Sequence, residues 1–161
     1  MNAYADTSFL VSLYTPDANS SRAALWMSSF RTAMAITPFG ELELTNALEQ
    51  RLFRKEIIAR NAQEAYRAFQ HDLDAGIYSP IPMPAAAYGR ARQLSRQHTA
   101  TLGSRTLDIL HVATALVLGA EAFCTFDTVQ AKLARAAGLA VTPARRRGER
   151  PPGRHGGGSQ G

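Results

Sequence analysis

The stretch TLDILHVATAL, residues 106–116, decides how the rest of the chain is interpreted. Four apolar residues in it recur at helical spacing, which predicts a helix with one buried face: Ile109, Val112, Ala113 and Leu116. The Thr106 hydroxyl is expected to cap the first turn, which places Asp108 where the helix dipole favours a negative charge. Taken alone, Asp108 is a structural acid at a helix N-terminus, so its meaning depends on the other acids of the chain.

Short apolar runs alternate with helical patterns on both sides of this stretch. Strands are expected at residues 2–5, 33–37, 122–125 and 139–141. Helices are expected after residue 6, after residue 19, and at residues 38–54, 61–75, 84–97, 106–118 and 128–137. The proline-interrupted run 77–82 suits a short connection rather than a central strand, and residues 98–104 suit a polar loop. This alternation predicts an α/β domain with a mostly parallel sheet between helices.

Composition is that of an ordinary soluble globular protein, with 45% hydrophobic and 19% charged residues in a chain of 161. No apolar run approaches the roughly 20 residues that span a bilayer, and the first residues do not form a secretory signal. Cys124 is the only cysteine, which excludes an intrachain disulfide and a thiolate metal cluster. We therefore expect a cytoplasmic protein without a membrane partner.

The net charge of +5 resides mainly in the C-terminal tail. Residues 144–161 contain five arginines and one glutamate, so the tail supplies four of the five net positive charges. Arginine, proline and glycine dominate there, which predicts a disordered tail after a single domain at residues 1–143. An excess of basic residues indicates a nucleic-acid partner mainly when the folded domain carries it. Here the predicted domain has a net charge of only +1, so the overall charge is weak evidence for such a partner.

Acidic residues follow two of the predicted strands. Asp6 comes directly after the first strand, and Asp127 follows the strand that ends near Thr125. In parallel sheets, ligand sites lie outside the carboxyl ends of the strands. Glu43 and Asp108 lie near helix N-termini, which tend to face the same edge. The sequence therefore predicts that four carboxylates, distant along the chain, gather at one edge of the sheet.

Gathered carboxylates repel one another, so such a group is stable at neutral pH only when protons or cations neutralise it. Carboxylate oxygens suit Mg²⁺ or Mn²⁺, whereas a chain without a cysteine cluster does not favour Zn²⁺. One or two such ions activate water and stabilise the leaving oxygen of a phosphodiester. Acids alone therefore indicate nuclease chemistry.

Four motifs carry a resemblance to a known family. They are YADTS at residues 4–8, ELTNAL at 43–48, LDILHVATA at 107–115 and TFDTVQAKLA at 125–134. In this order and spacing, the chain resembles the PIN-domain ribonucleases and, within them, the VapC-like toxins of bacterial toxin–antitoxin pairs. The resemblance implies a three-layer α/β/α sandwich and a metal-dependent endoribonuclease that holds one or two Mg²⁺ or Mn²⁺ ions. It also implies a structured RNA substrate, tRNA or rRNA.

The resemblance also assigns roles to individual residues. Asp6, Glu43, Asp108 and Asp127 match the acidic metal ligands, and the Thr125 and Ser8 hydroxyls match positions that flank the site. Glu43 is chosen over Glu41 because the family glutamate lies three residues before an Asn-Ala-Leu run, here residues 46–48. The remaining polar residues near the motifs have simpler expected roles: Asn46 supports the site, His111 packs or faces its edge, Cys124 fills the core, and Arg105 contacts RNA phosphate or solvent.

Partners follow from the same resemblance. VapC-like proteins pair with a small antitoxin and commonly form homodimers, so we expect both here, at surfaces near Trp26, Phe30, Phe53 and Phe69. Two other functions remain open from the sequence. One is a PIN-fold module that binds RNA or protein with little catalysis. The other is a phosphatase or phospho-acceptor domain with Asp6 as nucleophile, although Ser8 stands where such phosphatases usually place a second acid.

Overall fold

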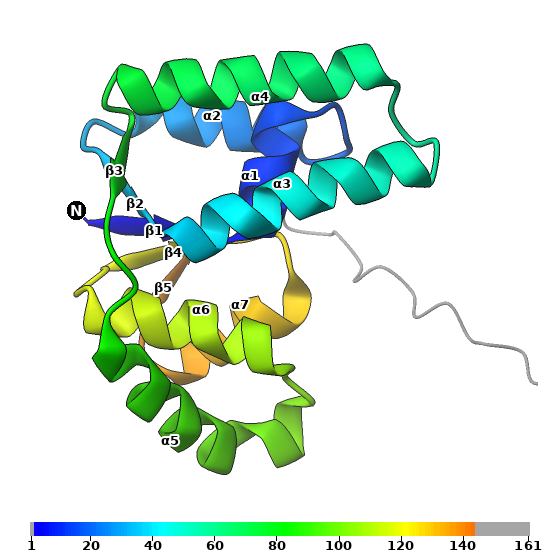
Figure 1. Ribbon diagram of the computed structural model, residues 1–161. Coiled ribbons are helices and arrows are strands. Elements are labelled where there is room, and N and C mark those ends of the chain that lie inside the picture. The colour runs from blue at the N-terminus through cyan, green and yellow to red at the C-terminus, as the bar shows by residue number, and fades with distance from the viewer. Residues whose placement is uncertain (1, 144–161) are drawn as a thin grey trace, which may run out of the picture.

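A sheet of short parallel strands forms the centre of the protein (Figure 1). The computed structural model describes residues 2–143, and in this part the strand order is β3-β2-β1-β4-β5. The strands are β1 (Ala3–Ala5), β2 (Met34–Ile36), β3 (Tyr78–Pro80), β4 (Ala122–Cys124) and β5 (Ala140–Thr142). All described pairings are parallel, which confirms the predicted sheet. The predicted disorder of the tail lies outside the described residues.

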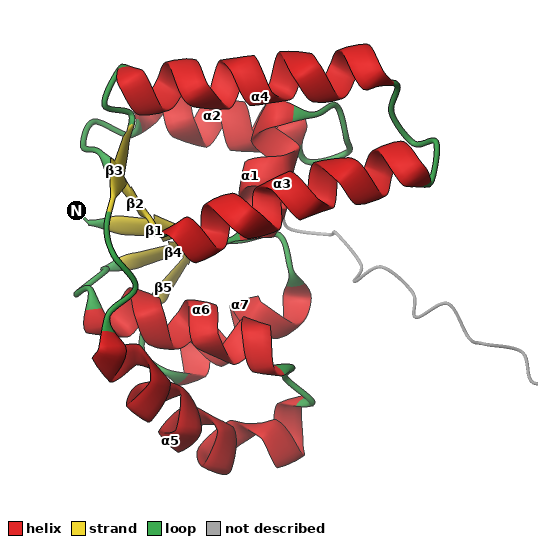
Figure 2. Cartoon of the chain, viewed as in Figure 1, coloured by secondary structure: helices red, strands yellow, loops and turns green. Residues whose placement is uncertain are grey.

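Helices cover both faces of this sheet and complete a three-layer α/β/α sandwich (Figure 2). One face carries α1 (Thr7–Tyr14), α2 (Ser20–Ser29), α3 (Pro38–Phe53) and α4 (Ala59–Asp74). The other carries α5 (Ala85–Leu102), α6 (Thr106–Val117) and α7 (Thr128–Ala136). None of the helices in residues 2–143 is both long and apolar enough to cross a membrane.

Alternating strand residues supply two separate cores. Ala3 and Ala5 pack with the layer of α1 to α4, whereas Tyr4 between them packs with α5, α6 and α7. This period of two is the expected geometry of a strand buried on both faces. The apolar stripe of α6 is buried as predicted, because Ile109 and Val112 belong to the second core.

Two loop predictions need correction. The connection expected at residues 77–82 contains β3, which pairs with β2 at the edge of the sheet. Pro80 fits there because an edge strand needs hydrogen-bond donors on only one side. The polar loop expected at residues 98–104 is mostly helix, since α5 continues to Leu102. Gly103 ends that helix with a φ of 66°, a conformation that glycine adopts without steric cost.

The start of α6 also differs from the prediction. Thr106 does not cap the helix, because Arg105 occupies the N-cap position. The carboxylate of Asp108 turns back and accepts a hydrogen bond from the Arg105 backbone N–H at 3.0 Å. Asp108 therefore accepts from a backbone N–H that has no partner within the helix, whereas the prediction assigned the capping of this turn to the Thr106 hydroxyl.

Sheet hydrogen bonds continue past the ends of the central strands. The Asp6 N–H donates to the carbonyl of Cys124 at 3.0 Å, and the Thr125 N–H donates to the carbonyl of Thr142 at 3.0 Å. Cys124 is fully buried, as expected for a core residue. This pairing brings Asp6, the first residue after β1, beside Thr125, the first residue after β4.

Candidate active site

Asp6 is the centre of a buried hydrogen-bond network. Its side chain caps α1 by accepting from the Phe9 N–H at 2.9 Å. The hydroxyls of Ser8 and Thr125 donate to the same carboxylate at 2.8 and 2.6 Å. Asp6 has no exposed surface. Burial raises the pKa of Asp6 to about 6, although the hydrogen bond from Thr125 opposes the rise.

The Ser8 hydroxyl joins Asp6 to the segment after β4. While it donates to Asp6, its oxygen accepts from the backbone N–H groups of Phe126 and Asp127 at 2.8 and 3.1 Å. The Asp127 N–H also donates to the Thr125 hydroxyl at 2.9 Å. Both hydroxyls therefore lie between the two acids that follow β1 and β4, where the resemblance placed them.

Asp127 and Asp108 are connected through the first turn of α7. Asp127 caps this helix by accepting from the Val129 and Gln130 N–H groups, each at 2.7 Å. The side-chain amide of Gln130 donates to Asp108 at 3.3 Å. One glutamine thus contacts acids on two helices, and the sequence analysis did not identify it. The spacing of Asp127 and Gln130 matches a capping box, which is the sequence pattern that could have drawn attention to it.

Glu43 lies in a second network beside the first. The Thr7 hydroxyl donates to Glu43 at 2.7 Å, and His111 Nε2 contacts the same carboxylate oxygen. Burial alone would raise the pKa of Glu43, but the contacts with His111 and Thr7 outweigh it and hold this pKa below its ordinary value. Glu43 rather than Glu41 makes these contacts. The sequence analysis missed Thr7, although it adjoins Asp6.

His111 combines packing with a polar contact to the site. It is 1% exposed, its ring lies against Phe39, and its Nδ1 is 3.0 Å from the Tyr4 hydroxyl. Burial raises the pKa of Tyr4 far above its ordinary value, with a hydrogen bond from Thr37 opposing the rise, so the phenol keeps its proton. Tyr4 then donates to Nδ1, and the Nε2–H is left to donate to Glu43.

This arrangement gives a testable energetic coupling. His111→Ala is expected to destabilise the fold by roughly 1–3 kcal/mol beyond its loss of packing, because the Tyr4 hydroxyl hydrogen then has no acceptor. Tyr4→Phe removes that hydrogen, so the double variant should lose less than the sum of the two single variants, by roughly 1 kcal/mol. Urea unfolding of the four proteins measures this coupling. Strictly additive losses would show that the contact contributes nothing.

Three of the four predicted acids are linked through donors rather than packed against one another, and Glu43 lies in the neighbouring network with Thr7 and His111. In the described part of the chain, no three His, Cys, Asp or Glu side chains form a group that could hold a metal ion by themselves. Ser8 and Thr125 lie between Asp6 and Asp127, and Gln130 lies between Asp127 and Asp108. Carboxylates repel at short range, so this spacing by neutral donors is the expected way to keep them at one edge.

A polar groove of about 740 Å³ opens beside these residues. Thr7, Ser8, Asp127 and Gln130 line one part of it. Three arginines also line it, Arg51, Arg54 and Arg105, together with the acids Asp17 and Glu56. Arg51 is paired with Glu56 at 3.3 Å, whereas Arg54 and Arg105 are exposed. The lining of the groove therefore contains both acidic and cationic side chains, and Asp127 is the predicted site acid that belongs to it.

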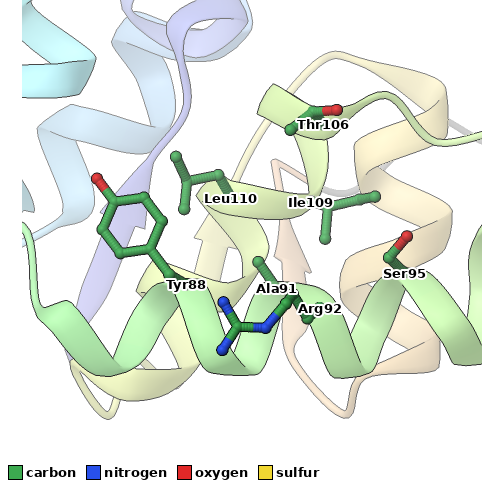
Figure 3. Close-up of a pocket in the computed structure, with 7 residues that line it drawn as sticks. All are labelled: Tyr88, Ala91, Arg92, Ser95, Thr106, Ile109 and Leu110. Atoms are coloured by element: carbon green, nitrogen blue, oxygen red, sulfur yellow. The ribbon is translucent and has the colours of Figure 1, made fainter.

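A smaller hollow of about 270 Å³ lies between α5 and α6 (Figure 3). Tyr88 and Arg92 of α5 and Thr106 and Leu110 of α6 border it. Thr106 and Leu110 are each two residues from Asp108, which places them about 200° away around the helix. This hollow is therefore separate from the polar groove.

Comparison with known proteins identifies the family of this chain. The family profile of the PIN domain matches residues 3–136. The chain is thus an α/β protein with acids at the carboxyl edge of a parallel sheet, and it belongs to the PIN-domain family. A comparison with curated proteins gives no significant match.

Several solved structures share the fold at low sequence identity. VapC20 of Mycobacterium tuberculosis, described as a sarcin–ricin loop cleaving toxin, is 18% identical with a TM-score of 0.65, and the match covers 86% of this chain and 97% of that one. A toxin–antitoxin complex from Klebsiella pneumoniae is 16% identical with a TM-score of 0.57, covering 81% and 90%. VapBC2 of Rickettsia felis, bound to a promoter DNA fragment, is 17% identical with a TM-score of 0.57, covering 88% and 97%.

Proposed function

We propose that this protein is a metal-dependent endoribonuclease toxin that a cognate antitoxin inhibits. The observation that carries the proposal is the fully buried Asp6 at the carboxyl edge of a PIN-domain sheet, connected by hydroxyls to Asp127. Asp108 and Glu43 lie in adjoining networks. A positive charge stabilises a buried carboxylate at neutral pH, and a divalent cation would provide it.

The donor set fits Mg²⁺ or Mn²⁺. The candidate ligands are carboxylate oxygens, which these ions prefer, and one further oxygen in the same region, Gln130 Oε1, is buried without a partner within residues 2–143. Asp6, Glu43, Asp108 and Asp127 would hold one or two ions. A bound ion lowers the pKa of a water molecule and stabilises developing negative charge. The Ser8 and Thr125 hydroxyls keep Asp6 in its orientation.

RNA is the proposed substrate because the groove suits a phosphate backbone. Exposed Arg54 and Arg105 flank it, and arginine recognises phosphate through paired donors. A structural relative described as a sarcin–ricin loop cleaving toxin supports an rRNA substrate, and tRNA is the other structured RNA that we propose. The phosphatase alternative gains no support, since Ser8, which stands where such phosphatases place a second acid, instead donates to Asp6.

An antitoxin of the VapB type is the proposed partner, together with a second copy of this chain. Structural relatives that are toxin–antitoxin complexes support the first. Leu25 and Phe53 are 73% and 86% exposed, and Trp26 stacks on Phe30 next to Leu25. These residues are the proposed contact surfaces. Phe69, expected among them, is instead only 9% exposed and packs in the core.

The experiment that tests this function uses the chain purified free of antitoxin. Incubated with total RNA and Mn²⁺, the protein is expected to produce discrete fragments, and EDTA is expected to abolish them. Sequencing the fragment ends would identify the RNA and the position of cleavage. Binding of RNA without any Mn²⁺-dependent cleavage would contradict the enzyme and favour a PIN-fold binding module.

A further inference from the structure

Gln130 contacts acids at the start of two helices, one through its backbone and the other through its side chain. Its backbone N–H donates to Asp127 Oδ1 at 2.7 Å, and its amide Nε2 donates to Asp108 Oδ1 at 3.3 Å. Only 8% of the residue is exposed, and it lines the groove together with Ser8 and Asp127. Gln130 therefore connects the two carboxylates.

A capping role does not explain the position of this side chain. In a capping box, the glutamine of the first turn reaches back to the N–H of the N-cap residue. Here that N–H, on Asp127, already donates to the Ser8 and Thr125 hydroxyls at 3.1 and 2.9 Å. The Gln130 amide is free of the cap, and it reaches a carboxylate of another helix instead.

The other end of the amide has no partner. An ionised carboxylate only accepts hydrogen bonds, so the amide NH₂ must face Asp108 and the oxygen must face away from it. Gln130 Oε1 is buried, and no hydrogen-bond partner for it exists within residues 2–143. A buried acceptor left unpaired costs roughly 1–3 kcal/mol. An amide oxygen is also a hard ligand for oxygen-preferring divalent cations.

We propose that Gln130 is a further residue of the metal centre, whose amide nitrogen orients Asp108 and whose amide oxygen binds the divalent cation or a water of its shell. The inference rests on the proposed function and adds a neutral oxygen ligand to its acidic residues. A neutral ligand suits this place because it holds two carboxylates together without adding a third negative charge.

The test is Mn²⁺ affinity measured by calorimetry without RNA, so that the readout does not depend on cleavage. Gln130→Met keeps the length of the side chain and removes both polar atoms, and it is expected to weaken Mn²⁺ binding 10- to 100-fold. Gln130→Glu returns an oxygen to the same place but cannot donate to Asp108, so it is expected to bind Mn²⁺ more tightly than Gln130→Met and less tightly than the parent. Gln97→Met, on the exposed face of α5, is the matched control and should bind Mn²⁺ like the parent.

Thermal unfolding separates a ligand effect from a folding effect, since Gln130→Met should unfold at the parent temperature or above it in the absence of metal. Unchanged Mn²⁺ affinity in Gln130→Met would overturn the inference, and so would a Gln130→Glu variant that binds as weakly as Gln130→Met. Either result leaves the proposed function intact if the parent binds Mn²⁺ and cleaves RNA. A parent that does neither would overturn the proposed function itself.

Discussion

Asp6→Asn is expected to lower the rate of RNA cleavage by roughly 10³-fold or more. The change removes the charge of the most buried acid of the site and keeps its shape. Metal-based charge stabilisation contributes several kcal/mol to such reactions, and each 1.36 kcal/mol corresponds to a tenfold change in rate. The fold should survive, because an asparagine oxygen still accepts from the Phe9 N–H and caps α1.

Cleavage of total RNA in Mn²⁺, followed over time on a gel, measures this effect. Asp74→Asn is the matched control, since Asp74 lies on α4 and contacts only Gln70 among the side-chain hydrogen bonds described. The control should cleave at the parent rate. An Asp6→Asn protein that is folded and still cleaves RNA within tenfold of the parent would remove Asp6 from the mechanism.

The same substitution is expected to change how folding stability depends on pH. The pKa of Asp6 is about 6 in the folded protein and 3.8 as the ordinary value, so between these values the folded state binds more protons than the unfolded state. Stability from this group is therefore present at low pH and is lost as pH rises through about 6. A difference of about two pH units corresponds to about 3 kcal/mol.

The parent protein should accordingly lose roughly 2–3 kcal/mol relative to Asp6→Asn between pH 4 and pH 8. Urea unfolding of both proteins in EDTA, at a series of pH values, isolates this contribution, because all other titrating groups are common to the two. A difference between the two unfolding free energies that stays constant across this range would contradict the raised pKa of Asp6.

Much of the fold follows from local patterns in the sequence. The alternation of short apolar runs with helical periods places the central strands and the helices, and Thr37 followed by Pro38 marks the start of α3, where the Thr37 side chain accepts from the Gly40 N–H. The two wrong loop predictions lie where the local sequence pattern and the tertiary contacts favour different structures. β3 is a strand only because β2 offers an open edge, and α5 continues through polar residues because nothing before Gly103 stops it.

The sequence indicates candidate site residues but not their connections. Asp6, Asp108 and Asp127 stand out by their places after strands or at a helix N-terminus, whereas Glu43 is chosen over Glu41 only by the family resemblance. Which donors each would meet could not be predicted, because Thr7, Tyr4 and Gln130 act across elements that are distant in sequence. His111 illustrates the difference, since its helical position predicts burial, while its contact with Glu43 depends on how α3 packs against α6.

We propose that the acids at this edge bind a divalent cation that RNA cleavage requires. A calorimetric titration of the antitoxin-free protein with Mn²⁺, carried out in parallel on Asp6→Asn, measures this binding without RNA. We expect saturable binding of one or two ions by the parent and a loss of most of that affinity in the variant. An absence of Mn²⁺ binding by the folded parent, or equal affinity in the two proteins, would contradict it.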